Sequence, residues 1–200
     1  MTIKAIFFDM GGVILRTADK TERTKLAKEF GMSMEELDRF VFECKTAAQA
    51  SMGMISVMEH WLDVTRRLKL PDQEMPRIRD AFFGGDIIDQ EIISLLRSLK
   101  STHKTGLISN AWDDMREWMT SQKIEDAFNI LIISAEVGFA KPDPRIYQLA
   151  LEKAGVSAEE SIFVDDVEKN ITACNALGMH GVHFKNQPQA MQEIRALLQI

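Results

Sequence analysis

Four stretches of the chain carry polar side chains that could do chemistry together. Each lies just after an apolar run typical of a buried strand, or on the loop that leaves it. The side chains are those of Asp9, Ser109 with Asn110, Lys141, and Asp165 with Asp166. Carboxylates and turn carbonyls are hard oxygen ligands that suit Mg²⁺. A carboxylate can also attack phosphorus and form an aspartyl phosphate that water then hydrolyses.

The remaining residue types fit the same chemistry. Lys141 and Ser109 could bind the equatorial oxygens of a phosphoryl group. The neighbouring carboxylates of Asp165 and Asp166 repel one another unless a cation lies between them. Each stretch alone also has an ordinary structural reading, as a turn, a helix N-cap or a solvated loop lysine. Their joint occurrence at strand ends favours a phosphoryl-transfer site.

A parallel sheet would bring these distant residues to one edge. The apolar run over residues 3–8 predicts a buried strand that ends at Asp9, and Gly11 and Gly12 allow a sharp turn and a close approach by another group. Later strands are predicted over residues 105–108, 130–133, 161–164 and 181–184, with helical patterns between them. This alternation predicts an α/β fold with a Rossmann-like, doubly wound parallel sheet, whose strand ends share one edge.

A long helical segment interrupts the sheet pattern after its first strand. Residues 19–83 have helical periodicity and no convincing strand, and the pairs Ser33 with Glu36 and Ser56 with Glu59 are capping boxes. The predicted organisation is a Rossmann-like core over residues 1–15 and 86–200, with a helical insertion over residues 16–85.

Composition excludes several classes of partner. The chain has 200 residues, of which 46% are apolar, and a net charge of −6 with no run of Lys or Arg, which argues against nucleic-acid binding. Neither a signal peptide nor a membrane span is predicted, since no apolar run is long enough. Cys44 and Cys174 lie far apart and fit a reducing compartment, so we expect a cytoplasmic protein. The oligomeric state stays open.

The four stretches resemble the four motifs of the haloacid dehalogenase-like hydrolase superfamily. The matching segments are residues 8–14 (Phe-Asp-Met-Gly-Gly-Val-Ile), 107–110 (Leu-Ile-Ser-Asn), 137–147 (from Val-Gly through Lys-Pro-Asp-Pro to Ile-Tyr) and 163–170 (Phe-Val-Asp-Asp, ending at Asn170). The resemblance covers the whole predicted core, and the helical insertion is similar to the small helical cap of that superfamily.

This resemblance implies a role for each residue around the nucleophile. Asp9 would be the nucleophile, and Mg²⁺ would be held by Asp9, the backbone carbonyl of Gly11 and Asp166. Asp165 and Asn170 would contact the metal ligands rather than the metal itself. Asp165 could instead reach the metal through a water molecule.

The resemblance also implies how the substrate is held. Ser109 and Lys141 would bind the phosphoryl group, Lys141 would take part in catalysis, and Asn110 would lie near the substrate. The implied activity is Mg²⁺-dependent hydrolysis of a small phosphate ester.

One position departs from the pattern of phosphatases in this superfamily. They usually carry a second Asp two residues after the nucleophile, as the general acid for the leaving group, and here that residue is Gly11. A missing general acid lowers the rate by about 10²–10⁴-fold if nothing replaces it. The first motif resembles the branch of epoxide-hydrolase-like phosphatases, where sugar-phosphate phosphatases occur. A substrate with a good leaving group, such as an anomeric sugar phosphate, would need the acid least.

Two alternatives stay open. A 2-haloacid dehalogenase would use the same Asp9 to attack carbon without a metal, although that branch usually has Tyr and then Gly-Thr where this chain has Gly11-Gly12-Val13. A binding or regulatory protein that has lost catalysis would also explain Gly11.

Overall fold

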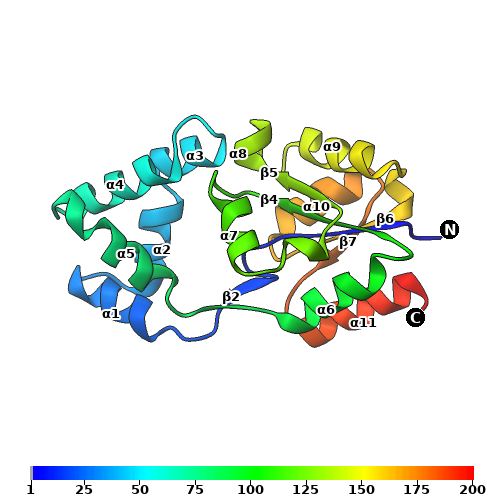
Figure 1. Cartoon of the computed structure of the whole chain (residues 1–200), viewed down its shortest axis with the longest axis horizontal. Coiled ribbons are helices and arrows are strands. Elements are labelled where there is room, and N and C mark those ends of the chain that lie inside the picture. Colours follow the sequence, from blue (N-terminus) through cyan, green and yellow to red (C-terminus); the bar gives the residue numbers. More distant parts are fainter. Residues whose placement is uncertain (1) are drawn as a thin grey trace.

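The structure is a computed structural model that describes residues 2–200. Within this range a parallel sheet of five strands has the order β5-β4-β1-β6-β7, so the first strand lies at its centre (Figure 1). The strands are β1 (Ala5–Phe8), β4 (Lys104–Ser109), β5 (Ile130–Ile133), β6 (Ser161–Asp165) and β7 (His180–His183). The predicted α/β class is confirmed, and the four later strands end within a residue of their predicted limits.

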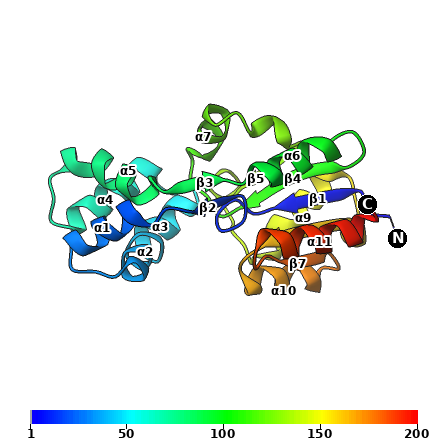
Figure 2. The same ribbon diagram turned by 90° about the horizontal axis from the view of Figure 1, so that it is seen from below.

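Helices cover both faces of this sheet (Figures 1 and 2). One face packs against α6 (Gln90–Leu99), α7 (Met115–Ser121) and α11 (Gln187–Leu198), and the other against α9 (Pro144–Ala154) and α10 (Glu168–Ala176). The four residues of β1 are fully buried and alternate between the two apolar clusters. A strand buried on both faces explains why the sequence reads as a continuous apolar run.

The inserted helices have an apolar cluster of their own, and in the sequence they lie between two short strands. These helices are α1 (Thr21–Glu29), α2 (Met34–Phe42), α3 (Lys45–Ser51), α4 (Val57–Arg67) and α5 (Met75–Phe83). Their cluster is built around Trp61 and Phe82, which are fully buried. Both predicted capping boxes are present, at the N-termini of α2 and α4.

An antiparallel ribbon joins the insertion to the sheet. It pairs β2 (Leu15–Thr17) with β3 (Asp86–Ile88), and neither strand was predicted, because a run of three residues shows no periodicity. The division proposed at residues 15 and 85 would fall at this ribbon.

The remaining elements are short. They are α8 (Ser134–Val137) and the 3₁₀ helices η1 (Asp72–Glu74), η2 (Glu125–Ala127) and η3 (Ala158–Glu160). No helix within residues 2–200 has both the length and the apolar character needed to cross a membrane.

Candidate active site at the carboxyl edge of the sheet

Three neighbouring central strands end together and place the predicted residues at one edge. Phe8, the last residue of β1, pairs with Leu107 on one side and Val164 on the other. The backbone N–H of Asp9 donates to the Val164 carbonyl at 2.9 Å, so Asp9 continues the ladder one step beyond β1. Ser109 and Asp165 are the last residues of their strands. The convergence expected from a parallel sheet is therefore present.

Lys141 lies between two of the carboxylates. Its Nζ is 2.8 Å from Oδ1 of Asp9 and 2.6 Å from Oδ2 of Asp165. The side chains of Lys141 and Asp165 are 1% and 0% exposed, so both charges lie out of water. An ionised group in such surroundings is stable only when it is paired. Lys141 thus neutralises part of the negative charge that the strand ends bring together.

Both carboxylate oxygens of Asp165 accept hydrogen bonds from other residues. Its Oδ1 accepts from the backbone N–H of Val167 at 2.8 Å, and its Oδ2 accepts from Lys141. The side-chain amide of Asn170 reaches both oxygens, at 3.0 and 3.1 Å. These donors fix the orientation of the Asp165 carboxylate, and the supporting role implied for Asp165 and Asn170 stays a prediction.

Asp9 and Asp166 keep free oxygens. Oδ1 of Asp9 accepts from Lys141 and from the backbone N–H of Met10 at 2.7 Å, whereas no protein donor within residues 2–200 reaches Oδ2. No other described residue donates a hydrogen bond to the carboxylate of Asp166. The Gly11 carbonyl accepts no backbone hydrogen bond in the described chain.

Burial gives these carboxylates unusual proton affinities. Burial raises the pKa of Asp9 from 3.8 to about 6, although the positive charge of Lys141 opposes the rise. Burial, together with the negative charge of Asp165, also raises the pKa of Asp166. Carboxylates with raised pKa values are stabilised in their charged form by a nearby cation.

The donor set fits a hard divalent cation. One oxygen from each of Asp9, Asp165 and Asp166 lies within 4.8 Å of the other two. Because Asp165 is already hydrogen-bonded, the free oxygens belong to Asp9, Asp166 and the Gly11 carbonyl. The resemblance implied these three groups as metal ligands, and that assignment stays a prediction.

Gly12 makes room for Asp166. Its φ is +78°, and a Cβ built there would lie 2.1 Å from Oδ2 of Asp166. The close approach that the sequence predicted for this glycine pair therefore occurs at Gly12, and the approaching group is a carboxylate 154 positions later in the chain.

Replacing Gly12 with Ala is expected to lower Mg²⁺ affinity by about 10–100-fold, as when groups that orient metal ligands are lost. The added Cβ must displace the Asp166 carboxylate or the turn. Isothermal titration with Mg²⁺ measures the effect. Gly155→Ala is a matched control, since Gly155 has φ +68° but open space around its Cβ. An affinity of Gly12→Ala within twofold of the wild type would contradict this role.

Asn110 and Ser109 differ in what they contact. The Asn110 side chain donates to the Lys141 carbonyl at 2.9 Å and accepts from the Lys141 backbone N–H at 2.7 Å. Both polar groups of this amide therefore hold the Lys141 loop, which the sequence could not indicate. Ser109 is 3% exposed, and its hydroxyl makes no hydrogen bond within the described residues.

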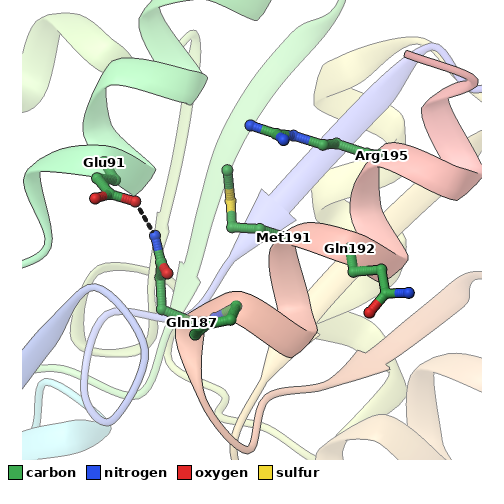
Figure 3. Close-up of a pocket in the computed structure, with 6 residues that line it drawn as sticks. Glu91, Gln187, Met191, Gln192 and Arg195 are labelled. Atoms are coloured by element: carbon green, nitrogen blue, oxygen red, sulfur yellow. Dashed lines mark hydrogen bonds between the residues drawn. The ribbon is translucent and has the colours of Figure 1, made fainter.

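Sequence reasoning missed one further residue at this edge. His183 of β7 donates from Nε2 to the backbone carbonyl of Asp166 at 3.0 Å. No motif could have revealed this contact, because its partner is a main-chain oxygen. A surface groove between α6 and α11 is a separate feature that includes none of the predicted site residues (Figure 3). Its lining residues are Glu91, Gln187, Pro188, Met191, Gln192 and Arg195.

The fold and this edge together define a Rossmann-like α/β protein with a carboxylate and lysine cluster at its strand ends. A family model of haloacid dehalogenase-like hydrolases matches residues 3–178, and the chain belongs to that family.

Several known proteins are similar to the chain. The sesquiterpene phosphatase astK of Aspergillus oryzae is 28% identical over 98% of this chain and 97% of its own length. The HAD family enzyme bt-2542 of Bacteroides thetaiotaomicron, solved in complex with magnesium and inorganic phosphate, is 25% identical with a TM-score of 0.73 and covers 90% of this chain and 93% of its own. A predicted HAD-like hydrolase from Porphyromonas gingivalis, at 21% identity and a TM-score of 0.75, covers 97% of this chain and 98% of its own and shares the fold.

Proposed function

We propose that the protein is a Mg²⁺-dependent phosphatase of a small phosphorylated metabolite, with Asp9 as nucleophile. The observation that carries the proposal is the carboxylate of Asp9, which has one oxygen held by Lys141 and the other free at the sheet edge. The phosphatase name of the Aspergillus relative and the magnesium and phosphate of the Bacteroides enzyme support it.

The residues divide the reaction between them. The Asp9 carboxylate attacks phosphorus through the oxygen that does not hold the metal, the bond from phosphorus to the ester oxygen breaks, and water then hydrolyses the resulting aspartyl phosphate. Lys141 offsets the negative charge on the attacking carboxylate and the phosphoryl oxygens, and the free hydroxyl of Ser109 donates to one of those oxygens. When bound through Asp9, Asp166 and the Gly11 carbonyl, Mg²⁺ supplies further positive charge to the phosphoryl group.

The leaving group limits the choice of substrate. Gly11 offers no proton donor, so the departing oxygen must leave with little protonation. We infer that the substrate has a leaving group of low pKa, with anomeric sugar phosphates as the first class to examine. The name of the Aspergillus relative adds terpenoid phosphates to the classes to be screened.

A phosphate-release screen with and without Mg²⁺ tests the proposal. The panel holds sugar 1-phosphates and 6-phosphates, terpenoid phosphates, nucleotides and phosphoglycolate-like acids. We expect turnover that EDTA removes and that falls as the leaving-group pKa rises. Halide release from 2-haloacids without metal would support the dehalogenase alternative instead, and the absence of any turnover would support the binding alternative.

Introducing the missing acid, Gly11→Asp, is expected to raise kcat on alkyl phosphates, with an upper limit of about 10²–10⁴-fold. A side chain fits there, because the space around the Gly11 Cβ is open and its φ lies outside the left-handed region. Aryl phosphates, whose leaving groups need no proton, are expected to change little. Gly11→Asn is the control of equal size without the proton, and equal rates for both variants would contradict the inference.

Mg²⁺ is expected to stabilise the protein more at about pH 7.5 than at about pH 5. The pKa of Asp9 is about 6 in the folded state and near 3.8 in the unfolded chain, so folding takes up a proton between these values. The metal-free protein therefore loses stability as the pH rises through this window, and the charged carboxylate that results binds the cation. Melting temperatures with and without Mg²⁺ at both pH values measure this, and equal shifts would contradict it.

A further inference from the structure

The inserted helices make a second contact with the sheet half of the chain, which is the five-stranded sheet with the helices and loops that follow β3. This contact is separate from the β2–β3 ribbon. This second contact involves the loop after β4, residues 110–114, and the helix α8, which lies next to α3 (Figure 1). Of this loop, only its first residue, Asn110, belongs to the motif over residues 107–110.

Trp112 is the centre of this contact. It is half-buried and packs against the apolar cluster of the inserted helices. Its ring centroid lies 4.8 Å from that of His60, 5.8 Å from that of Phe42 and 6.1 Å from that of Trp61. Aromatic pairs at such distances stabilise a contact by more than the burial of their apolar area alone. A side chain from the sheet half thus completes the core of the inserted helices.

Polar groups fasten the contact on both sides of Trp112. The backbone N–H of Val57, in the first turn of α4, donates to Oδ1 of Asp113 at 2.9 Å. This N–H has no partner within its own helix, so Asp113 caps α4 from the other half of the chain. Arg79 of α5 forms an ion pair with Asp114. On α8, the Ala135 carbonyl oxygen would lie 2.1 Å from a Cβ built on Gly53, so the two backbones touch directly.

The same loop is bonded to the candidate active site. The Ser134 hydroxyl bonds both the N–H and the carbonyl of Ala111, each at 3.1 Å. Asn110 bonds both backbone groups of Lys141, as described above. Trp112 is therefore connected to Lys141, the lysine between Asp9 and Asp165, through the short chain segment from Trp112 to Asn110 and the two hydrogen bonds of Asn110.

We propose that Trp112 is a positioning residue, which transmits the docking of the inserted helices to Lys141. Docking fixes residues 110–114, and Asn110 then holds the Lys141 backbone where Nζ reaches both carboxylates. The effect on catalysis rests on the proposed function, whereas the effect on the Lys141 backbone does not.

Hydrogen exchange of the full chain tests this coupling without an activity assay. In Trp112→Ala we expect the amide of Lys141 and the amides of α3 and α4 to exchange at least about tenfold faster than in the wild type, because local protection falls with the contacts that maintain it. Trp112→Phe should restore most of the protection. The matched control is Trp118→Ala, since Trp118 is also half-buried but packs against the sheet cluster.

A milder variant covers the case in which Trp112→Ala fails to fold. Asp113 is exposed, so Asp113→Ala removes the cap on Val57 with little loss of burial, and it should speed exchange at the same amides to a smaller extent. Faster exchange in α3 and α4 with an unchanged Lys141 amide, in either variant, would overturn the proposal. An equal effect of Trp118→Ala on Lys141 would also overturn it.

Kinetics separate this role from a general loss of structure. If Lys141 is displaced, kcat should fall by about tenfold or more, since a small misplacement of a catalytic group is costly. The Mg²⁺ dissociation constant should not rise, because the proposed metal ligands lie on other loops and displacement of Lys141 takes a competing positive charge away from Asp9. If the wild type hydrolyses no phosphate ester, the proposed function fails and the exchange experiment still decides the role of Trp112.

Discussion

Replacing Lys141 with Met is expected to lower the free energy of unfolding by about 3–5 kcal/mol near neutral pH without metal. The substitution leaves Asp9 and Asp165 facing one another with no countercharge, and both are buried. Removing one partner from a buried ion pair is far more costly than removing a surface charge. Urea denaturation with an unchanged m-value measures the loss.

Two further variants show whether the loss comes from charge. Lys153→Met, at an exposed position on α9, should change stability by no more than about 0.5 kcal/mol. The double variant Lys141→Met with Asp9→Asn should recover part of the loss, because one of the two opposed carboxylates is gone. A loss below about 1 kcal/mol for Lys141→Met would mean that its charge is not what holds the strand ends together.

The second expected result is that Asp9→Asn abolishes turnover, by at least about 10⁴-fold, while the protein stays folded. An amide cannot act as the nucleophile, yet it keeps the size of the side chain. Because burial raises the pKa of Asp9, the carboxylate is a source of instability in the metal-free protein. The variant should therefore melt at the same temperature as the wild type or higher.

A surface carboxylate provides the control for this substitution. Asp126 pairs with Arg97 in an exposed position, and Asp126→Asn should leave kcat within about twofold of the wild type. Residual activity of Asp9→Asn above about 1% of the wild type, with deamidation excluded by mass spectrometry, would remove Asp9 from the role of nucleophile.

The sequence predicted the position of Asp9 because the signal is local. A continuous apolar run marks a strand buried on both faces, and the carboxyl end of such a strand is an edge where parallel neighbours also end. The capping boxes at Ser33 and Ser56 were predictable for the same reason, since each pattern spans four residues.

Contacts between distant parts of the chain could not be predicted from local patterns. Asp9 and Asp165 lie close enough to share Lys141 only because β1 and β6 are neighbours in the sheet, and the space at Gly12 is filled by Asp166 only because both strands end in register. The motif predicted that Lys141 binds the phosphoryl group. It did not indicate that Lys141 lies between two carboxylates or that Asn110 forms hydrogen bonds with its backbone. Trp112 carried no chemical motif, and its contacts depend on how the inserted helices dock.

The direct test of Asp9 as the nucleophile is the detection of a phosphoryl group on it. The wild type is mixed with Mg²⁺ and the best substrate of the screen, quenched in acid within a single turnover, digested and examined by mass spectrometry. We predict one phosphoryl group on the peptide that contains Asp9, absent without Mg²⁺ and absent in Asp9→Asn. Phosphate release with an unmodified Asp9 peptide at every quench time, or a substrate carbon attached to Asp9, would contradict the proposed reaction.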